Sequence, residues 1–287
     1  MTFKIALFGA PGFCKNIIAE LINSGQEVHY FMLNKDRNIK LETQANQITY
    51  INSIHETLVT DMLETFQPDY IFVASFHQKI PNEIIAIAQI EALNFHPSIL
   101  PNYRGPNPLF WLLKHGEDVG GITIHRLTEQ WDAGDILITH SFPINPYDTY
   151  ISLAEKVCHE TTFLMRKVMP SLKSRKLEFN PQGKGSYYGN IPKEDYVINW
   201  ENSAKDIHNL IRALPMDTPA LMLFNKQPIQ IIESEISAIL SDTSGKIWIN
   251  QDQIYIGTND YYLKLNIVKY RSQFYTGAIF LKALEGF

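Results

Sequence analysis

The chain has 287 residues, 45% of them hydrophobic and 19% charged, a balance that is typical of a folded globular protein and argues against a disordered one. The formal net charge is -5, which argues against a nucleic-acid partner, because a protein that binds phosphates tightly usually presents a basic face. The two cysteines, Cys14 and Cys158, lie far apart and outside any Cys/His cluster, so we expect no disulfide framework, no structural zinc site and no other metal.

The first part of the chain alternates strand-like and helix-like patterns. Three continuous apolar runs have the length of buried strands, namely Lys4–Phe8, Val28–Leu33 and Tyr70–Ala74. Between them, apolar residues at helical spacing predict one helix over 17–22 that ends before Gly25 and another over 58–66 that ends before Pro68. This β-α-β-α-β order predicts an α/β fold, a Rossmann-like, mostly parallel sheet with helices on both faces. Ligands of such sheets bind outside the carboxyl ends of the strands.

Three more strands and a long helix complete the predicted first domain. They are Ala92–Phe95, Gly121–Leu127, Ile136–Phe142 and the amphipathic helix Thr149–Met169. No apolar stretch is long enough to span a bilayer, and the apolar run at the N-terminus is interrupted by Gly9 and Pro11. We therefore expect a cytoplasmic protein that does not associate with membranes.

Glycine, proline, asparagine and tyrosine dominate residues 177–195, a composition that is typical of a linker. The sequence therefore predicts a larger domain at residues 1–176 and a small C-terminal domain at residues 196–287. The small domain begins with a helix over Ser203–Leu214, which Ser203 can cap. Short β-like runs follow, at 220–224, 229–233, 246–250, 254–257 and 262–268. They predict a β-rich, barrel-like domain.

Three polar residues lie after predicted strands, at the edge where ligands are expected. Asn94 and His96 are two residues apart at a strand end, so their side chains point to the same side of the sheet. Pro97 and Pro101 stiffen the turn that follows. Asp132 lies in a loop beside a neighbouring strand, where its carboxylate can meet His96. An amide donor, an imidazole and a carboxylate together suit acyl transfer without a covalent nucleophile.

Four short motifs contain or surround these residues. They are Asn-x-His-x-Ser-x-Leu-Pro from Asn94, Arg-Gly-x-x-Pro from Arg104, Gly-x-Thr-x-His from Gly121 and Asp-x-Gly-x-Ile from Asp132. In kind and order they resemble the folate-dependent formyltransferase family, which includes glycinamide ribonucleotide, methionyl-tRNA and sugar N-formyltransferases. Residues 198–213 are similar to the C-terminal module of the tRNA and sugar branches. The resemblance implies that the larger domain is a formyltransferase catalytic domain with 10-formyltetrahydrofolate as its co-substrate.

The resemblance also implies a role for each polar residue. The acceptor amine attacks the formyl carbon, and Asn94 would donate a hydrogen bond to the oxyanion that forms. His96 would assist proton transfer. Asp132 would orient His96 and favour its charged form, because a nearby carboxylate raises the pKa of a histidine. His125 is expected to have a structural role.

Two loops would hold the folate, largely through main-chain groups. Their residues are Ser75, Phe76, His77, Gln78, Lys79, Ile80, Trp131, Asp132, Ala133, Gly134 and Asp135. The acceptor would lie against Gly9, Pro11, Ser98, Arg104, Gly105 and Asn107. Arg104 either binds an acceptor phosphate or braces its own loop, and both roles stay open. The turn after the first strand is not GxGxxG, which argues against dinucleotide binding and an NAD-dependent oxidoreductase.

The nature of the acceptor is predicted from what the chain lacks. Methionyl-tRNA formyltransferases usually carry a long basic insertion after the second strand, whereas residues 34–42 are few and mixed in sign. Glycinamide ribonucleotide enzymes normally lack a second domain. A nucleotide-linked amino sugar is therefore the leading acceptor, with methionyl-tRNA, a carrier-bound amino acid and a siderophore precursor as alternatives. A non-catalytic folate-binding protein is disfavoured because Asn94, His96 and Asp132 are all present, and a homodimer stays open.

Overall fold

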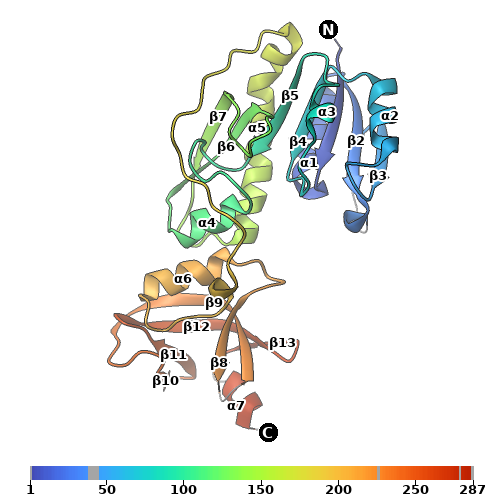
Figure 1. The fold of residues 1–287 in the computed structure, drawn as a ribbon. Coiled ribbons are helices and arrows are strands. Elements are labelled where there is room, and N and C mark those ends of the chain that lie inside the picture. The colour runs from blue at the N-terminus through green and yellow to red at the C-terminus, as the bar shows by residue number, and fades with distance from the viewer. Residues whose placement is uncertain (1, 38–44, 225–226, 278, 286–287) are drawn as a thin grey trace. The chain divides into compact units, whose positions relative to one another are not determined.

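The structure is a computed structural model that describes residues 2–37, 45–224, 227–277 and 279–285. Residues 38–42, part of the short stretch after the second predicted strand, lie outside the described residues. The chain divides into two units, each built on one sheet (Figure 1). The first unit comprises Met1–Pro108, Val119–Pro143 and Ala154–Tyr188, and the second comprises Leu109–Asp118, Ile144–Leu153 and Gly189–Phe287.

The first unit contains a seven-stranded sheet in the order β3-β2-β1-β4-β5-β6-β7. Its strands are β1 (Lys4–Gly9), β2 (Glu27–Leu33), β3 (Gln47–Ile51), β4 (Tyr70–Ala74), β5 (Glu91–His96), β6 (Val119–Arg126) and β7 (Ile136–Pro143). The strands β1 to β5 are parallel, and β6 and β7 pair antiparallel. The predicted α/β fold with a mostly parallel sheet is confirmed.

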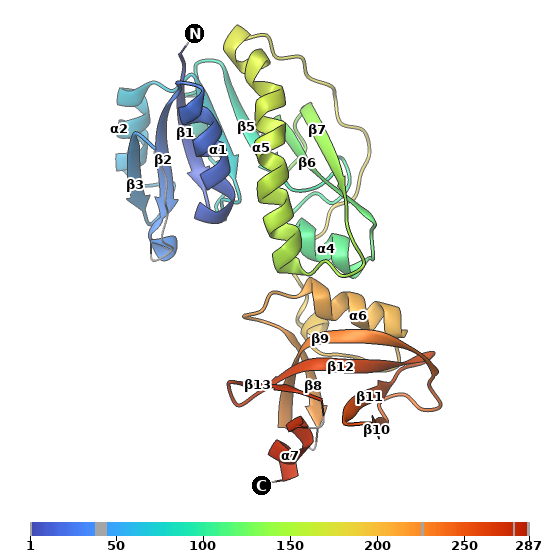
Figure 2. The same cartoon turned by 180° about the vertical axis from the view of Figure 1, so that it is seen from behind.

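Helices cover both faces of this sheet, as predicted. Figure 2 shows α1 (Pro11–Asn23) and α5 (Tyr150–Ser174) together on one face, and the opposite view in Figure 1 shows α2 (Thr57–Phe66) and α3 (Asn82–Ile85) on the other. An ion pair of 2.7 Å between Arg166 of α5 and Glu20 of α1 joins the first two helices. Of α5, the residues from Ala154 onward belong to the first unit.

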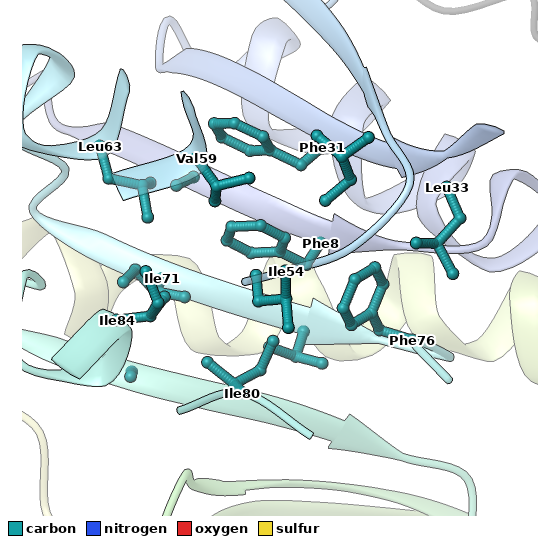
Figure 3. Packing of buried hydrophobic residues seen from close by; sticks show 14 residues of the cluster. Phe8, Phe31, Leu33, Ile54, Val59, Leu63, Ile71, Phe76, Ile80 and Ile84 are labelled. Carbon is teal, nitrogen blue, oxygen red and sulfur yellow. The ribbon is translucent and has the colours of Figure 1, made fainter. Parts of the chain in front are cut away.

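The core between the sheet and α2 and α3 is rich in aromatic rings (Figure 3). Phe8 of β1 and Phe31 of β2 stack with their centroids 4.7 Å apart, and Phe76 meets Phe8 edge-on at 5.6 Å. Burial of one such side chain stabilises the fold by about 1.5–3 kcal/mol. These contacts fix the carboxyl ends of β1, β2 and β4, which form one edge of the parallel sheet.

The second unit contains an antiparallel sheet in the order β10-β11-β12-β9-β8, with β13 paired to β12. Its elements include α4 (Pro108–Lys114), α6 (Ala204–Ala213), β8 (Ala220–Phe224), β9 (Gln227–Leu240), β10 (Ile247–Asn250), β11 (Gln253–Gly257), β12 (Tyr261–Tyr270), β13 (Gln273–Thr276) and α7 (Ile279–Glu285). Ser203 caps α6, because its hydroxyl accepts the N–H of Asp206 at 3.1 Å. The predicted β-rich C-terminal domain is confirmed.

The sequence patterns did not predict β3, α3, α4, β13 and α7. The strand β3 is at the sheet edge and partly exposed, so it lacks the continuous apolar run of a central strand. The three helices have four to seven residues, too few to show a helical period. Among the residues that the structure describes, no helix is long and apolar enough to cross a membrane.

Candidate active site

Two neighbouring strands place the polar side chains of the site. β5 pairs antiparallel with β6, so that Asn94 lies opposite His125 and His96 lies opposite Thr123. Because side chains alternate along a strand, Asn94 and His96 face the same side. The loop between β6 and β7 brings Asp132 to the same place. Asn94, His96 and Asp132 therefore meet at the carboxyl end of β5.

Asp132 is the centre of this cluster and is buried, with 7% of its surface exposed. Its Oδ2 accepts the N–H of Gly105 at 2.8 Å, and its Oδ1 accepts the amide of Asn94 at 3.2 Å. Burial alone would raise the pKa of Asp132, but the imidazoles of His125 and His96 and the Gly105 N–H stabilise the carboxylate and lower the pKa. Asp132 is therefore ionised at neutral pH.

His96 is held in one tautomer. Its Nε2 lies 2.8 Å from the main-chain oxygen of Tyr103, and since that oxygen can only accept, Nε2 carries the proton. The Asp132 carboxylate raises the pKa of His96, as expected, and so does the Tyr103 carbonyl, but burial has the larger effect and lowers it. His96 is neutral, and its Nδ1, 3.4 Å from Asp132, can accept a proton.

The amide of Asn94 is oriented by His125. Nδ1 of His125 donates to the carbonyl of Arg126 at 2.9 Å, and its Nε2 lies 3.0 Å from the amide nitrogen of Asn94 and 3.6 Å from Oδ1 of Asp132. An N–H of Asn94 donates to Asp132 at 3.2 Å. A flipped amide would set its oxygen against the carboxylate, so the nitrogen faces Asp132. A substrate oxygen must replace one of these two partners to receive an Asn94 hydrogen bond.

Gln182, from the predicted linker, joins the two loops of the cluster. It accepts from Nε and Nη2 of Arg104 at 3.1 and 2.6 Å, and it donates to the main-chain oxygens of Asp132 and Gly134 at 3.0 and 2.5 Å. Asp132 in turn accepts from Gly105, which is next to Arg104, so a closed ring of hydrogen bonds links the loops. No local sequence pattern marks Gln182, because its side-chain partner Arg104 lies 78 residues away.

The residues predicted to contact the acceptor differ in their accessibility. Ser98 is fully buried, with its hydroxyl bonded to a main-chain carbonyl. Gly9 is buried where β1 packs on β4, since a Cβ there would lie 2.1 Å from the oxygen of Ala74. Pro11 is buried in the first turn of α1, whereas Asn107 is half-buried. Ser98, Gly9 and Pro11 are thus buried, whereas Asn107 keeps part of its surface exposed.

The predicted folate loops also mix buried and exposed residues. Exposed are Ser75, His77, Lys79 and Trp131; half-buried are Gln78, Ala133 and Asp135; buried are Phe76, Ile80, Asp132 and Gly134. Phe76 and Ile80 belong to the core cluster, so they shape the loop rather than its surface. In the described part of the chain, no three His, Cys, Asp or Glu side chains are grouped to hold a metal.

Two family models match the chain. The model described as formyl transferase matches residues 3–169, and the model described as formyl transferase, C-terminal domain, matches residues 190–282. The methionyl-tRNA formyltransferase of Halalkalibacterium halodurans is 30% identical over 274 residues, which cover 90% of this chain and 86% of that protein.

Two further proteins show the same likeness. The bifunctional polymyxin resistance protein ArnA of Wigglesworthia glossinidia brevipalpis is 32% identical over 237 residues, or 81% of this chain, which spans 36% of ArnA. An N-formyltransferase from Helicobacter canadensis, solved in complex with folinic acid and dTDP-3-aminofucose, gives a TM-score of 0.72. That match has 18% identity and covers 92% of this chain and 98% of the other, so it concerns the fold.

Proposed function

Because the chain belongs to the formyl transferase family, we propose that it transfers a formyl group from 10-formyltetrahydrofolate to the amine of a nucleotide-linked amino sugar. The cluster of Asn94, His96 and Asp132 is the observation that carries the proposal. It combines an amide donor, a neutral imidazole and an ionised carboxylate 3.4 Å from that imidazole. Formyl transfer to an amine needs a donor for the developing oxyanion, a base, and a partner for the base once it is charged.

In the proposed reaction, the amine attacks the formyl carbon and loses a proton to Nδ1 of His96. The imidazolium that forms lies beside Asp132, whose charge stabilises it more strongly in this buried place than it would in water. Asn94 exchanges one of its two hydrogen bonds for the formyl oxygen, where negative charge develops. Loss of one such donor typically costs about 100–1000-fold in rate. The C–N bond to the folate then breaks, and His96 returns the proton to the leaving nitrogen.

The exposed residues at this edge suit a planar co-substrate. Trp131 is 50% exposed and directly precedes Asp132, so its ring is available to pack against a pterin. Ser75 is exposed at the end of β4, the parallel neighbour of β5. Ligands of parallel sheets bind along this edge, which supports a folate held between the two loops.

The choice of acceptor rests on charge and on relatives. A net charge of -5 disfavours an acceptor whose phosphates need many lysines and arginines. The similar Helicobacter canadensis enzyme was solved with dTDP-3-aminofucose, which supports an amino sugar. The 30% identity to a methionyl-tRNA formyltransferase makes methionyl-tRNA the competing acceptor.

The test is release of tetrahydrofolate from 10-formyltetrahydrofolate in the presence of dTDP-linked amino sugars and, in parallel, methionyl-tRNA. We expect turnover with an amino sugar and little with the tRNA at physiological salt. Efficient turnover with methionyl-tRNA alone would keep the reaction and refute the acceptor. Folate binding without turnover on any amine would favour the non-catalytic binding protein.

A further inference from the structure

A cavity of about 300 Å³ lies at the carboxyl edge of the sheet in the first unit, and its lining includes none of Asn94, His96 and Asp132. The lining residues are Leu33, Asn34, Lys35, Asn52, His77 and Gln78. His77 and Gln78 belong to the predicted folate loop, but the proposed reaction steps use none of the lining side chains.

The strand order relates this cavity to the reacting groups. Its lining residues lie at or just after the ends of β2, β3 and β4, and the sheet order runs β3-β2-β1-β4-β5. Because these five strands are parallel, their carboxyl ends share one edge. His96 ends β5, so an extended ligand that follows this edge leads from the cavity, past the end of β4, to the catalytic cluster.

The polar side chains of the cavity are of two kinds. The amides are already paired, since Asn34 donates to Asn52 at 2.7 Å and Gln78 bonds to main-chain groups. Lys35 and His77, in contrast, have no hydrogen-bond or ion-pair partner among the residues that the structure describes. These two side chains are therefore the groups of the cavity that remain for a ligand.

The charge of the cavity points to the chemistry of that ligand. Among the described residues, no carboxylate lines the cavity, although Asp36 acts on His77 from nearby. Although part of its surface is exposed, the His77 ring has lost some of its hydration, which lowers its pKa, and the charge of Lys35 lowers it further, so at pH 7 His77 offers an uncharged N–H. A positive ammonium and an N–H donor together complement an anionic oxygen.

We propose that Lys35 and His77 bind the anionic end of one of the two substrates, either the glutamyl carboxylates of the folate or the diphosphate of the nucleotide sugar. Both sources present oxyanions that accept hydrogen bonds from an ammonium and an imidazole N–H. The proposal rests on the proposed function, and it adds a site that holds the far end of a substrate while the cluster acts on the formyl group.

The test compares the wild-type chain with Lys35→Gln and Lys35→Glu. The probes are 5-formyltetrahydrofolate with one glutamyl residue, the same compound with three, and dTDP, each titrated by calorimetry at low and physiological salt. Lys176→Gln is the matched control, because Lys176 is also exposed and follows α5 outside the cavity. We expect Lys35→Gln to weaken the anionic probe about fivefold, Lys35→Glu to weaken it more, and the control to change nothing.

The outcomes separate the two sources. Weaker binding of the triglutamyl compound, with dTDP unchanged, assigns the carboxylates, and weaker binding of dTDP assigns the diphosphate. Unchanged constants for all three probes overturn the proposal. Formyl transfer is measured on the same samples. If the wild-type chain shows no turnover, the result counts against the proposed function. If it turns over normally and the Lys35 variants bind all three probes as wild type does, the result counts against this site alone.

Discussion

Gln182 is predicted to position Asp132, so Gln182→Ala should slow formyl transfer although Gln182 contacts neither reacting atom in the proposed mechanism. Its four hydrogen bonds tie the Arg104 side chain to the main chain of Asp132 and Gly134. Asp132 has a positive φ of 51°, in the left-handed region that Asp and Asn adopt more readily than other non-glycine residues. Removing the amide leaves the carboxylate less firmly held beside His96.

The magnitude follows from the kind of bonds lost. Each hydrogen bond contributes a net ~1 kcal/mol, and because Gln182 is half-buried, water replaces part of the loss. A displacement of about 1 Å at a reacting group costs about 100-fold. We therefore expect kcat to fall about 10- to 100-fold in Gln182→Ala, with the KM for folate changed much less.

A double-mutant cycle with Arg104→Ala distinguishes the two roles of Arg104. If Arg104 acts through Gln182, the double variant should be about as slow as either single variant, with a coupling of about 1.4–2.7 kcal/mol, the equivalent of the 10- to 100-fold single loss. Additive losses, with a higher acceptor KM in Arg104→Ala alone, would refute this reasoning and assign Arg104 to an acceptor phosphate. Lys184→Ala serves as the control, because Lys184 is exposed and only two residues from Gln182.

Two further predictions concern His96 and Gly105. Burial lowers the pKa of His96, so the ring stays neutral and able to accept a proton below the usual histidine pKa of 6.5. We therefore expect kcat/KM to stay level from about pH 8 to about pH 6.5. A fall in kcat/KM towards acid that is centred above pH 7 would contradict this expectation. Gly105 has a φ of 99°, and a Cβ there would lie 2.2 Å from the main-chain oxygen of Tyr188. Gly105→Ala should therefore lower the free energy of unfolding by about 1–3 kcal/mol and kcat by at least about tenfold, as measured by thermal unfolding and steady-state kinetics. Gly12→Ala is the control: a Cβ at Gly12 would have no atom within 4 Å, so neither quantity should change.

The sequence predicts those strands and helices whose apolar pattern can be recognised within a few consecutive residues. The strands β1, β2 and β4 are continuous apolar runs because both faces of a parallel sheet are buried. The meeting of Asn94, His96 and Asp132 could also be anticipated, since β5 and β6 are neighbours and their ends fix the loops. The edge strand β3 was missed because the polar residues Gln47 and Thr49, which a partly exposed edge strand tolerates, break its apolar run.

Features that depend on tertiary contacts could not be read from the sequence. The segment at 177–188 has the composition of a linker, yet Tyr103 donates its N–H to Ser186 at 2.9 Å, and Tyr103 stacks with Tyr188 at 5.2 Å. Its partners lie about 80 residues earlier, and no local period marks such pairs. The effect of burial on the pKa of His96 could not be read from the sequence either, because a neighbouring carboxylate is visible in a motif and burial is not.

The central claim is that His96 is the base of a formyl transfer. It is tested most directly by the rate of tetrahydrofolate release in wild type and His96→Asn with 10-formyltetrahydrofolate and the best acceptor, with folate binding measured on the same samples. We expect the variant to lose about 100- to 10,000-fold in rate and to bind folate within about twofold of wild type. A variant that turns over at the wild-type rate would contradict the account.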